Sequence, residues 1–97
     1  MIVMKFGGSS VRNAEMIRRV VDIAHGRLEA APLLVSSAMG KTTDRLVLVA
    51  DYAEAGDRDG AFGLIETLEE HHRAVAAELV AGDRAAGLMR ALDALFE

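Results

Sequence analysis

Short apolar runs alternate along this chain with longer stretches in which apolar residues recur every three or four positions. The first run is Ile2–Phe6, and a second, Leu33-Leu34-Val35, follows Pro32. Apolar residues on both sides of the pleat are typical of strands in a parallel sheet that is buried on both faces. The pattern therefore predicts one strand at each of these places.

A helix is predicted between the two strands, from about Asn13 to His25. Asn13 is a favoured N-cap, Glu15 in the first turn suits the helix dipole, and Gly26 offers a C-terminal stop. The residues expected on its apolar face recur at helical spacing: Ile17, Val20, Val21 and Ala24.

Helical spacing also dominates the chain after the second strand. A second helix is expected to begin near Thr43 and to stop at Gly56, with an apolar face made of Leu46, Val49, Ala50 and Ala53. Residues 60–80 predict a third helix, whose stripe is Ile65, Leu68, His72, Val75 and Leu79. After a break at Gly82-Asp83, a fourth helix is expected to run to the last residue, with Leu88, Leu92, Leu95 and Phe96 on one face.

The order strand, helix, strand, helix predicts an α/β fold with two parallel strands joined by a crossover helix, followed by a helical segment. Both small-residue loops then lie at the carboxyl ends of strands, where open α/β sheets bind ligands. Two strands alone leave both edges and an apolar face open. We therefore expect residues 1–97 to be the front part of a larger α/β domain, or to complete their sheet with another copy.

Composition narrows the class of protein. Hydrophobic residues make up 52% of the chain and charged residues 27%, which is typical of a globular domain. The chain has no cysteine, which excludes disulfides and thiolate chemistry and favours a cytoplasmic location. We expect no membrane segment and no targeting leader. An acidic pI of 5.3 and 4% aromatic residues argue against nucleic-acid binding.

The net charge of −4 conceals an asymmetry between the two halves of the chain. Residues 1–50 carry seven basic and four acidic side chains, a net charge of +3, and residues 51–97 carry a net charge of −7. The two small-residue loops lie in the basic half, which favours an anionic ligand there.

The stretch KFGGSSV begins at Lys5, inside the first apolar run. Gly7 and Gly8 allow positive φ and let backbone N–H groups approach a phosphate closely, and a helix N-terminus behind them favours an anion. Ser9 and Ser10 add hydroxyl donors, and Lys5 can place an ammonium on phosphate oxygens. The alternatives are an ordinary turn and a lysine at a sheet edge that reaches water.

The stretch VSSAMGKTTD follows the second apolar run. Thr43 is explained as the N-cap of the next helix. The functional alternative is that the hydroxyls of Ser37 and Thr43, with loop N–H groups, bind a small polar substrate. If both loops lie at the same sheet edge, they form one crevice.

These two stretches resemble the signature motifs of the aspartokinases. KFGGSSV is similar to the family's opening motif K-F-G-G-[ST]-S-V, with Ser9 in place of the commoner threonine, and VSSAMGKTTD is similar to S-A-M-G-x-T-T-[DN]. Other amino-acid kinases share the lysine and glycine opening but not the second motif in this form. The resemblance is strong over residues 1–50 and weak over residues 51–97.

The resemblance implies an incomplete three-layer αβα amino-acid-kinase-like domain. Residues 1–97 would be the N-terminal part of the catalytic domain, with a ligand-binding half at 1–56 and a helical segment at 57–97. The implied reaction is phosphorylation of L-aspartate by ATP, with Mg²⁺, to 4-phospho-L-aspartate and ADP. This is the first step towards lysine, threonine, methionine and diaminopimelate.

Motif positions imply roles for individual residues. Lys5 would contact the transferred phosphoryl group, and Ser37 and Thr43 would contact the bound aspartate. The residues that would line the ATP phosphates are Gly7, Gly8 and Ser9. No covalent intermediate is needed, because the substrate carboxylate attacks the γ-phosphorus in line.

Several parts of an aspartokinase are not found in these 97 residues: later catalytic carboxylates, an arginine for the substrate carboxylate, an adenine-binding lobe and regulatory domains. We therefore expect little or no kinase activity from the chain alone, with partners in the remainder of a kinase chain or in a homo-oligomer. Two alternatives stay open: another amino-acid kinase of the superfamily, and a non-catalytic helical assembly module.

The pair His71-His72 is the remaining candidate for chemistry. Adjacent helical positions point about 100° apart, so the two rings cannot chelate one ion together. We expect no metal site here, with a partly buried His72 and an exposed His71.

Overall fold

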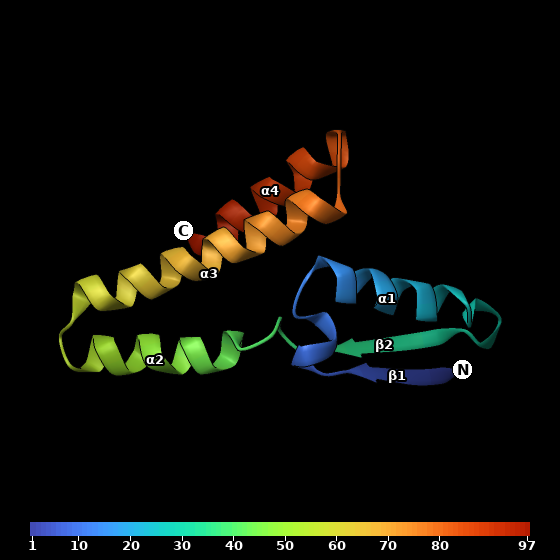
Figure 1. Cartoon of the computed structure of the whole chain (residues 1–97), viewed down its shortest axis with the longest axis horizontal. Coiled ribbons are helices and arrows are strands. Elements are labelled where there is room, and N and C mark those ends of the chain that lie inside the picture. Colours follow the sequence, from blue (N-terminus) through green and yellow to red (C-terminus); the bar gives the residue numbers. More distant parts are fainter. The chain divides into compact units, whose positions relative to one another are not determined.

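In the computed structural model, which describes residues 1–97, the chain divides into two units, Met1–Lys41 and Thr42–Glu97. The first unit contains β1 (Ile2–Phe6), η1 (Gly8–Val11), α1 (Ala14–His25), η2 (Leu28–Ala30) and β2 (Pro32–Ser36), as Figure 1 shows. The second unit contains α2 (Thr42–Glu54), α3 (Arg58–Leu79) and α4 (Asp83–Phe96). The predicted α/β class, with two parallel strands and a helical segment, is confirmed.

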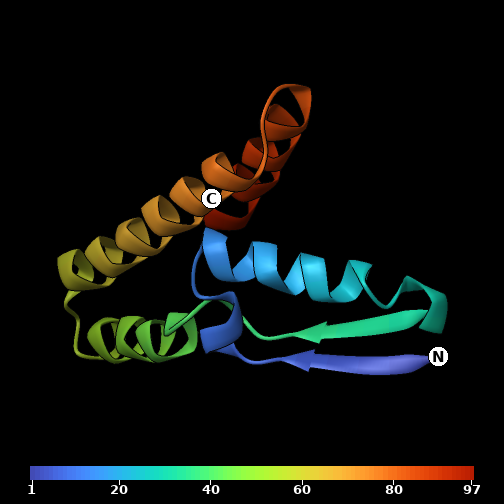
Figure 2. The ribbon, with the colours of Figure 1, turned by 45° about the vertical axis from the view of Figure 1, so that its right-hand side comes forward.

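The two strands of the first unit pair in parallel, in a register that runs from Ile2 opposite Pro32 to Phe6 opposite Ser36. Both strands therefore end at the same edge of the sheet. In both Figures 1 and 2, α1 runs alongside the strands that it connects. This arrangement brings the start of the two predicted ligand loops to one place.

Only one face of β1 is covered, and four of the five residues of β2 are exposed. Side chains alternate along β1, so that Ile2, Met4 and Phe6 are half-buried while Val3 and Lys5 are exposed. The prediction of burial on both faces is wrong for this chain, because Val3 is 63% exposed and Leu33 is 53% exposed. An apolar side chain favours a buried position, but burial also needs another helix or strand that packs over it.

Helix α1 begins and ends where the sequence predicts. The Asn13 side chain accepts a hydrogen bond from the backbone N–H of Met16 at 2.9 Å, and Gly26 forms the C-cap. Val20 is buried, as the apolar stripe requires. Val21 is 57% exposed, so its predicted place on the buried face is wrong.

The second unit consists of three helices in sequence. Gly56, at φ +80°, ends α2, and the Asp57 carboxylate caps α3 by accepting from the N–H of Gly60 at 2.9 Å. The predicted α3 stripe is confirmed, with Leu68 only 2% exposed and Val75 buried. No side chain of α2 is buried, so its predicted apolar face lies largely open to solvent.

Helix α4 packs against α3 through one line of side chains. Leu92 is buried, and Leu88 and Phe96 lie one turn away on either side of it. Leu95 is 78% exposed, so its predicted place on this face is wrong. The residue one turn after Leu92 on the packed face is Phe96, four positions further along. None of the helices combines the length and the hydrophobicity needed to cross a membrane.

Candidate functional site

Lys5 lies on the exposed face of β1, one residue before the strand ends. Its Nζ donates a hydrogen bond to Oγ of Ser37 at 3.1 Å. Ser37 directly follows β2, and its backbone N–H donates to the Phe6 carbonyl at 3.0 Å. Two side chains from separate sequence motifs therefore meet at the carboxyl edge of the sheet.

The two glycines of the first loop have different structural roles. Gly7 has φ −77° and ψ 174°, and a Cβ added there would meet nothing within 4 Å. A Cβ added at Gly8 would lie 2.7 Å from the Gly40 carbonyl oxygen. Neither glycine has positive φ, so that part of the expectation is wrong. The expected close approach of backbone is confirmed at Gly8, where the neighbouring backbone belongs to the second loop.

The second loop is bonded to the first through its own glycine. The Gly40 N–H donates to the Gly8 carbonyl at 2.9 Å, and Gly40 itself has φ +52°, a conformation that favours glycine. A Cβ at Gly40 would lie 3.5 Å from Cβ of Arg12. The first loop and the second loop as far as Gly40 are thus packed against each other.

The helix start behind the first loop differs from the expectation. Residues Gly8–Val11 form the single turn η1, and α1 begins only at Ala14. Asn13 already caps α1, so one of that helix's free N–H groups is engaged by the chain itself. The donors available to an anion at this edge therefore include the loop's own N–H groups and the Lys5 ammonium.

Arg12 is a cation at this edge that the sequence reasoning did not select. Its Nη1 donates to the Ser9 carbonyl at 3.1 Å, which ties the arginine to the first loop. The sequence signal for Arg12 was the position of a basic residue directly after the motif KFGGSSV. With one donor used, the guanidinium keeps further N–H groups for an anionic ligand.

Comparison with known proteins identifies the family. The sequence model of the "Amino acid kinase family" matches residues 1–97. The chain belongs to the amino acid kinase family.

Several relatives within this family are named as aspartokinases. The chain is 51% identical over 51 residues to "Aspartokinase 1, chloroplastic" of Arabidopsis thaliana, which covers 53% of this chain and 9% of the relative. It is 34% identical over 91 residues to the "Bifunctional aspartokinase/homoserine dehydrogenase 1, chloroplastic" of the same plant, and this match covers 94% of this chain and 10% of the relative. It is 46% identical over 52 residues to "Aspartokinase" of Mycobacterium bovis, and this match covers 52% of this chain and 12% of the relative. The chain thus spans about a tenth of the length of these relatives, and the predicted resemblance to aspartokinases is confirmed.

Thr43, the remaining predicted site residue, belongs to the second unit. It is exposed and lies in the first turn of α2, which begins at Thr42. Its predicted place as the N-cap is therefore wrong, since Thr43 is already inside the helix. Its proposed contact with substrate stays a prediction.

Arg73 of α3 forms ion pairs that serve packing within the second unit. The pKa of Arg73 is raised, first by its hydrogen bond to Asp93 and then by its hydrogen bond to Glu69 at 3.2 Å. The bond to Asp93 joins α3 to α4, and the bond to Glu69 lies within α3. They are distant in sequence from both loops and hold no ligand group.

The histidine pair of α3 also serves packing. The His72 Nδ1 lies 2.7 Å from the Leu68 carbonyl, and the His72 ring lies 5.7 Å from that of Phe96. His71 is half-buried rather than exposed, with its ring centroid 6.1 Å from that of His72. The expectation of an exposed His71 is wrong, because its ring stacks edge-on against its neighbour.

Proposed function

We propose that this chain supplies the phosphate-binding loop and part of the substrate site of an aspartate kinase. The enzyme would transfer the γ-phosphoryl group of ATP to the side-chain carboxylate of L-aspartate. The observation that carries the proposal is the 3.1 Å contact of the Lys5 ammonium with the Ser37 hydroxyl at the carboxyl edge of two parallel strands. Relatives named as aspartokinases support aspartate as the acceptor.

Each residue then has a role in an in-line displacement. An aspartate oxygen forms a bond to the γ-phosphorus, the bond to the ADP oxygen breaks, and no covalent enzyme intermediate forms. Lys5 offsets the negative charge that spreads over the transferred group. One of its three donors meets Ser37, which leaves two for phosphate oxygens. Gly7, Gly8 and Ser9 line the ATP phosphates.

The acceptor lies beside this loop in the proposal. The hydroxyls of Ser37 and Thr43 bind aspartate. The hydrogen bond between Lys5 and Ser37 sets the distance between the residues that bind ATP and those that bind aspartate. Holding the two reactants in line is a large part of what a kinase contributes to the rate. The Gly8–Gly40 contact fixes the two loops against each other for this purpose.

Mg²⁺ is part of the proposal only as a companion of ATP. The chain has no group of three His, Asp or Glu side chains that could hold a metal ion. When present, Mg²⁺ would neutralise charge on the phosphates.

The wider assignment follows from the same proposal. Residues 1–97 act as the N-terminal part of a catalytic domain, in the cytoplasm, with the remainder of a kinase chain or further copies as partners. The product, 4-phospho-L-aspartate, starts the route to lysine, threonine, methionine and diaminopimelate.

A chimera tests this function. Residues 1–97 replace the matching segment of the "Bifunctional aspartokinase/homoserine dehydrogenase 1, chloroplastic" of Arabidopsis thaliana, whose match covers 94% of this chain. ADP release is then measured with L-aspartate as the acceptor. We expect turnover that depends on aspartate. Lys5→Met should lower kcat/KM by about 10²–10³-fold, as loss of one transition-state donor does in other enzymes.

The control is Arg19→Met, which removes a cation from the exposed surface of α1 in the same unit. Its kcat/KM should stay within about twofold of the parent chimera. Full activity of Lys5→Met would contradict the proposal. Preference for glutamate, acetylglutamate or uridylate over aspartate would instead support a different amino-acid kinase.

A further inference from the structure

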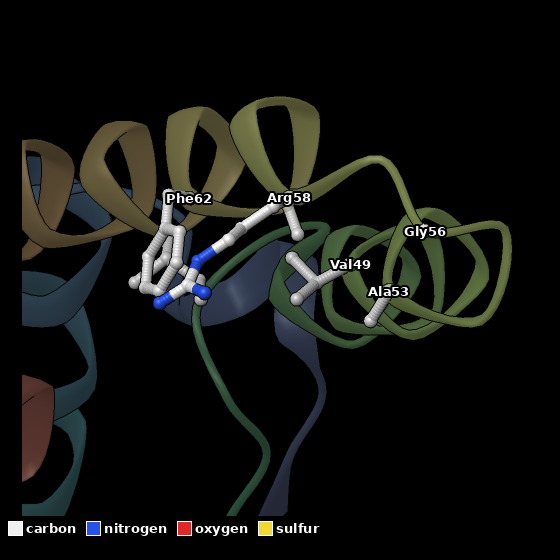
Figure 3. Close-up of a pocket in the computed structure, with 7 residues that line it drawn as sticks. Val49, Ala53, Gly56, Arg58 and Phe62 are labelled. Carbon is white, nitrogen blue, oxygen red and sulfur yellow. The ribbon is translucent and has the colours of Figure 1, made fainter.

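A groove between α2 and α3 lies entirely within the second unit. Its volume is about 460 Å³, which falls within the usual range of small-molecule pockets. Figure 3 shows Val49 and Ala53 of α2 on one side, Gly56 in the turn, and Arg58 and Phe62 of α3 on the other. The full lining is Val49, Ala53, Gly56, Arg58, Ala61, Phe62 and Ile65.

The walls of this groove are apolar. Ala61 is buried at its base with 8% exposure, and Val49 and Ile65 are half-buried. Phe62 is 56% exposed, so its ring offers a large apolar surface to an occupant. Apolar walls favour a ligand whose body is hydrocarbon.

A single charged side chain stands at the rim. The guanidinium carbon of Arg58 lies 5.4 Å from the centroid of the Phe62 ring, and the two side chains lie against each other in Figure 3. None of the ion pairs in the structure involves Arg58. The neighbouring Asp57 carboxylate is engaged by the N–H of Gly60. The guanidinium therefore stacks on a ring while its donors lack a carboxylate.

We propose that this groove binds a small amphipathic monocarboxylate. The hydrocarbon body lies between Val49 and Ile65, and the carboxylate meets the planar fork of Arg58, whose geometry matches two carboxylate oxygens. No lining residue is acidic, so the ammonium of a zwitterionic amino acid would have no partner there. Charge complementarity thus selects a carboxylate without an ammonium group.

The experiment is a titration of the 97-residue chain with 3-phenylpropanoate, followed by methyl and amide NMR. We expect saturable shifts at Val49, Ala61 and Ile65. The neutral 3-phenylpropanamide and zwitterionic phenylalanine should bind about tenfold to a hundredfold more weakly, since each loses or offsets the charge-assisted contact.

Variants locate the carboxylate. Arg58→Gln should weaken binding of 3-phenylpropanoate by the same factor, about tenfold or more. Arg84→Gln, at an exposed position in the first turn of α4, should leave binding unchanged. Circular dichroism checks that both variants keep the parent's helix content.

Three results would overturn the proposal: equal binding of the amide, unchanged binding to Arg58→Gln, or shifts confined to residues outside the groove. The comparison of acid with amide uses the unaltered chain, so it decides the matter even if a variant unfolds. ATP binding at the loops is not involved, so failure here leaves the proposed kinase role untouched.

Discussion

Gly8 is a residue at which a single added carbon would collide with the backbone of the second loop. Its hypothetical Cβ would lie 2.7 Å from the Gly40 oxygen and 3.2 Å from that of Ala38. Both neighbours are backbone atoms, so the conflict cannot be relieved by turning a side chain. The glycine therefore permits the two loops to touch, and with them Lys5 and Ser37.

Gly8→Ala should destabilise the first unit by about 1–3 kcal/mol, as overpacking does in other proteins, and should separate the two loops. Urea unfolding followed by circular dichroism measures the first effect, and amide shifts of residues 37–40 report the second. Gly7→Ala is the matched control. Its φ of −77° suits alanine and no atom is near, so stability should be unchanged or rise by about 0.4–1 kcal/mol. Equal stability of the two variants would contradict this account of the loop contact.

At the scale of helices, Leu68 holds the second unit together. It is 2% exposed in the middle of α3, and it is the largest fully buried side chain in the chain. Leu95 of α4 has the same side chain but is 78% exposed. The pair separates the effect of burial from the effect of residue type.

Leu68→Ala should lower the free energy of unfolding by about 2–5 kcal/mol, because it removes buried methyl groups and leaves a cavity. Leu95→Ala should change it by no more than about 0.5 kcal/mol. Chemical denaturation of both variants checks the difference. A large loss from Leu95→Ala would show that α4 packs through a different face.

The elements themselves were predictable because their signals are local. Asn13, Gly26 and Gly56 mark helix ends through a cap or a backbone conformation that the sequence alone specifies. Burial was not predictable in the same way. Val21 and Leu95 are apolar at helical spacing, yet both are exposed, because the side that is covered depends on which elements pack there.

The candidate site was predictable in part for the same reason. Lys5 and Ser37 could be placed at one sheet edge because parallel strands end together, and their hydrogen bond follows from that register. The contact of Gly8 with Gly40, and the bond from Arg12 to Ser9, depend on how two loops fold against each other. No spacing in the sequence encodes such an approach.

At the scale of the whole molecule, the chain offers one part of the proposed kinase site and a sheet with an open face. Val3 and Leu33 expose apolar surface on the sheet's open face. The groups proposed to bind phosphate and aspartate come from the end of β1, from the loops that follow β1 and β2, and from the first turn of α2. Phosphoryl transfer depends on several such groups acting together.

The 97-residue chain alone should therefore release ADP from ATP and L-aspartate at or near the background rate. A coupled assay measures this, with the chimera described above as the positive control. Turnover at an ordinary kinase rate, above about 1 s⁻¹, would show that these residues contain a complete active site.

The central claim is that the Lys5 ammonium and the amides of the first loop bind the phosphates of ATP. The most direct measurement is a titration of the labelled chain with ATP, observed at the backbone amides of Gly7, Gly8 and Ser9, for the parent, Lys5→Met and Arg19→Met. We predict saturable shifts at these amides in the parent and in Arg19→Met, with affinity about tenfold to a hundredfold weaker in Lys5→Met. Shifts that avoid this loop, or an affinity that Lys5→Met leaves unaltered, would contradict the account.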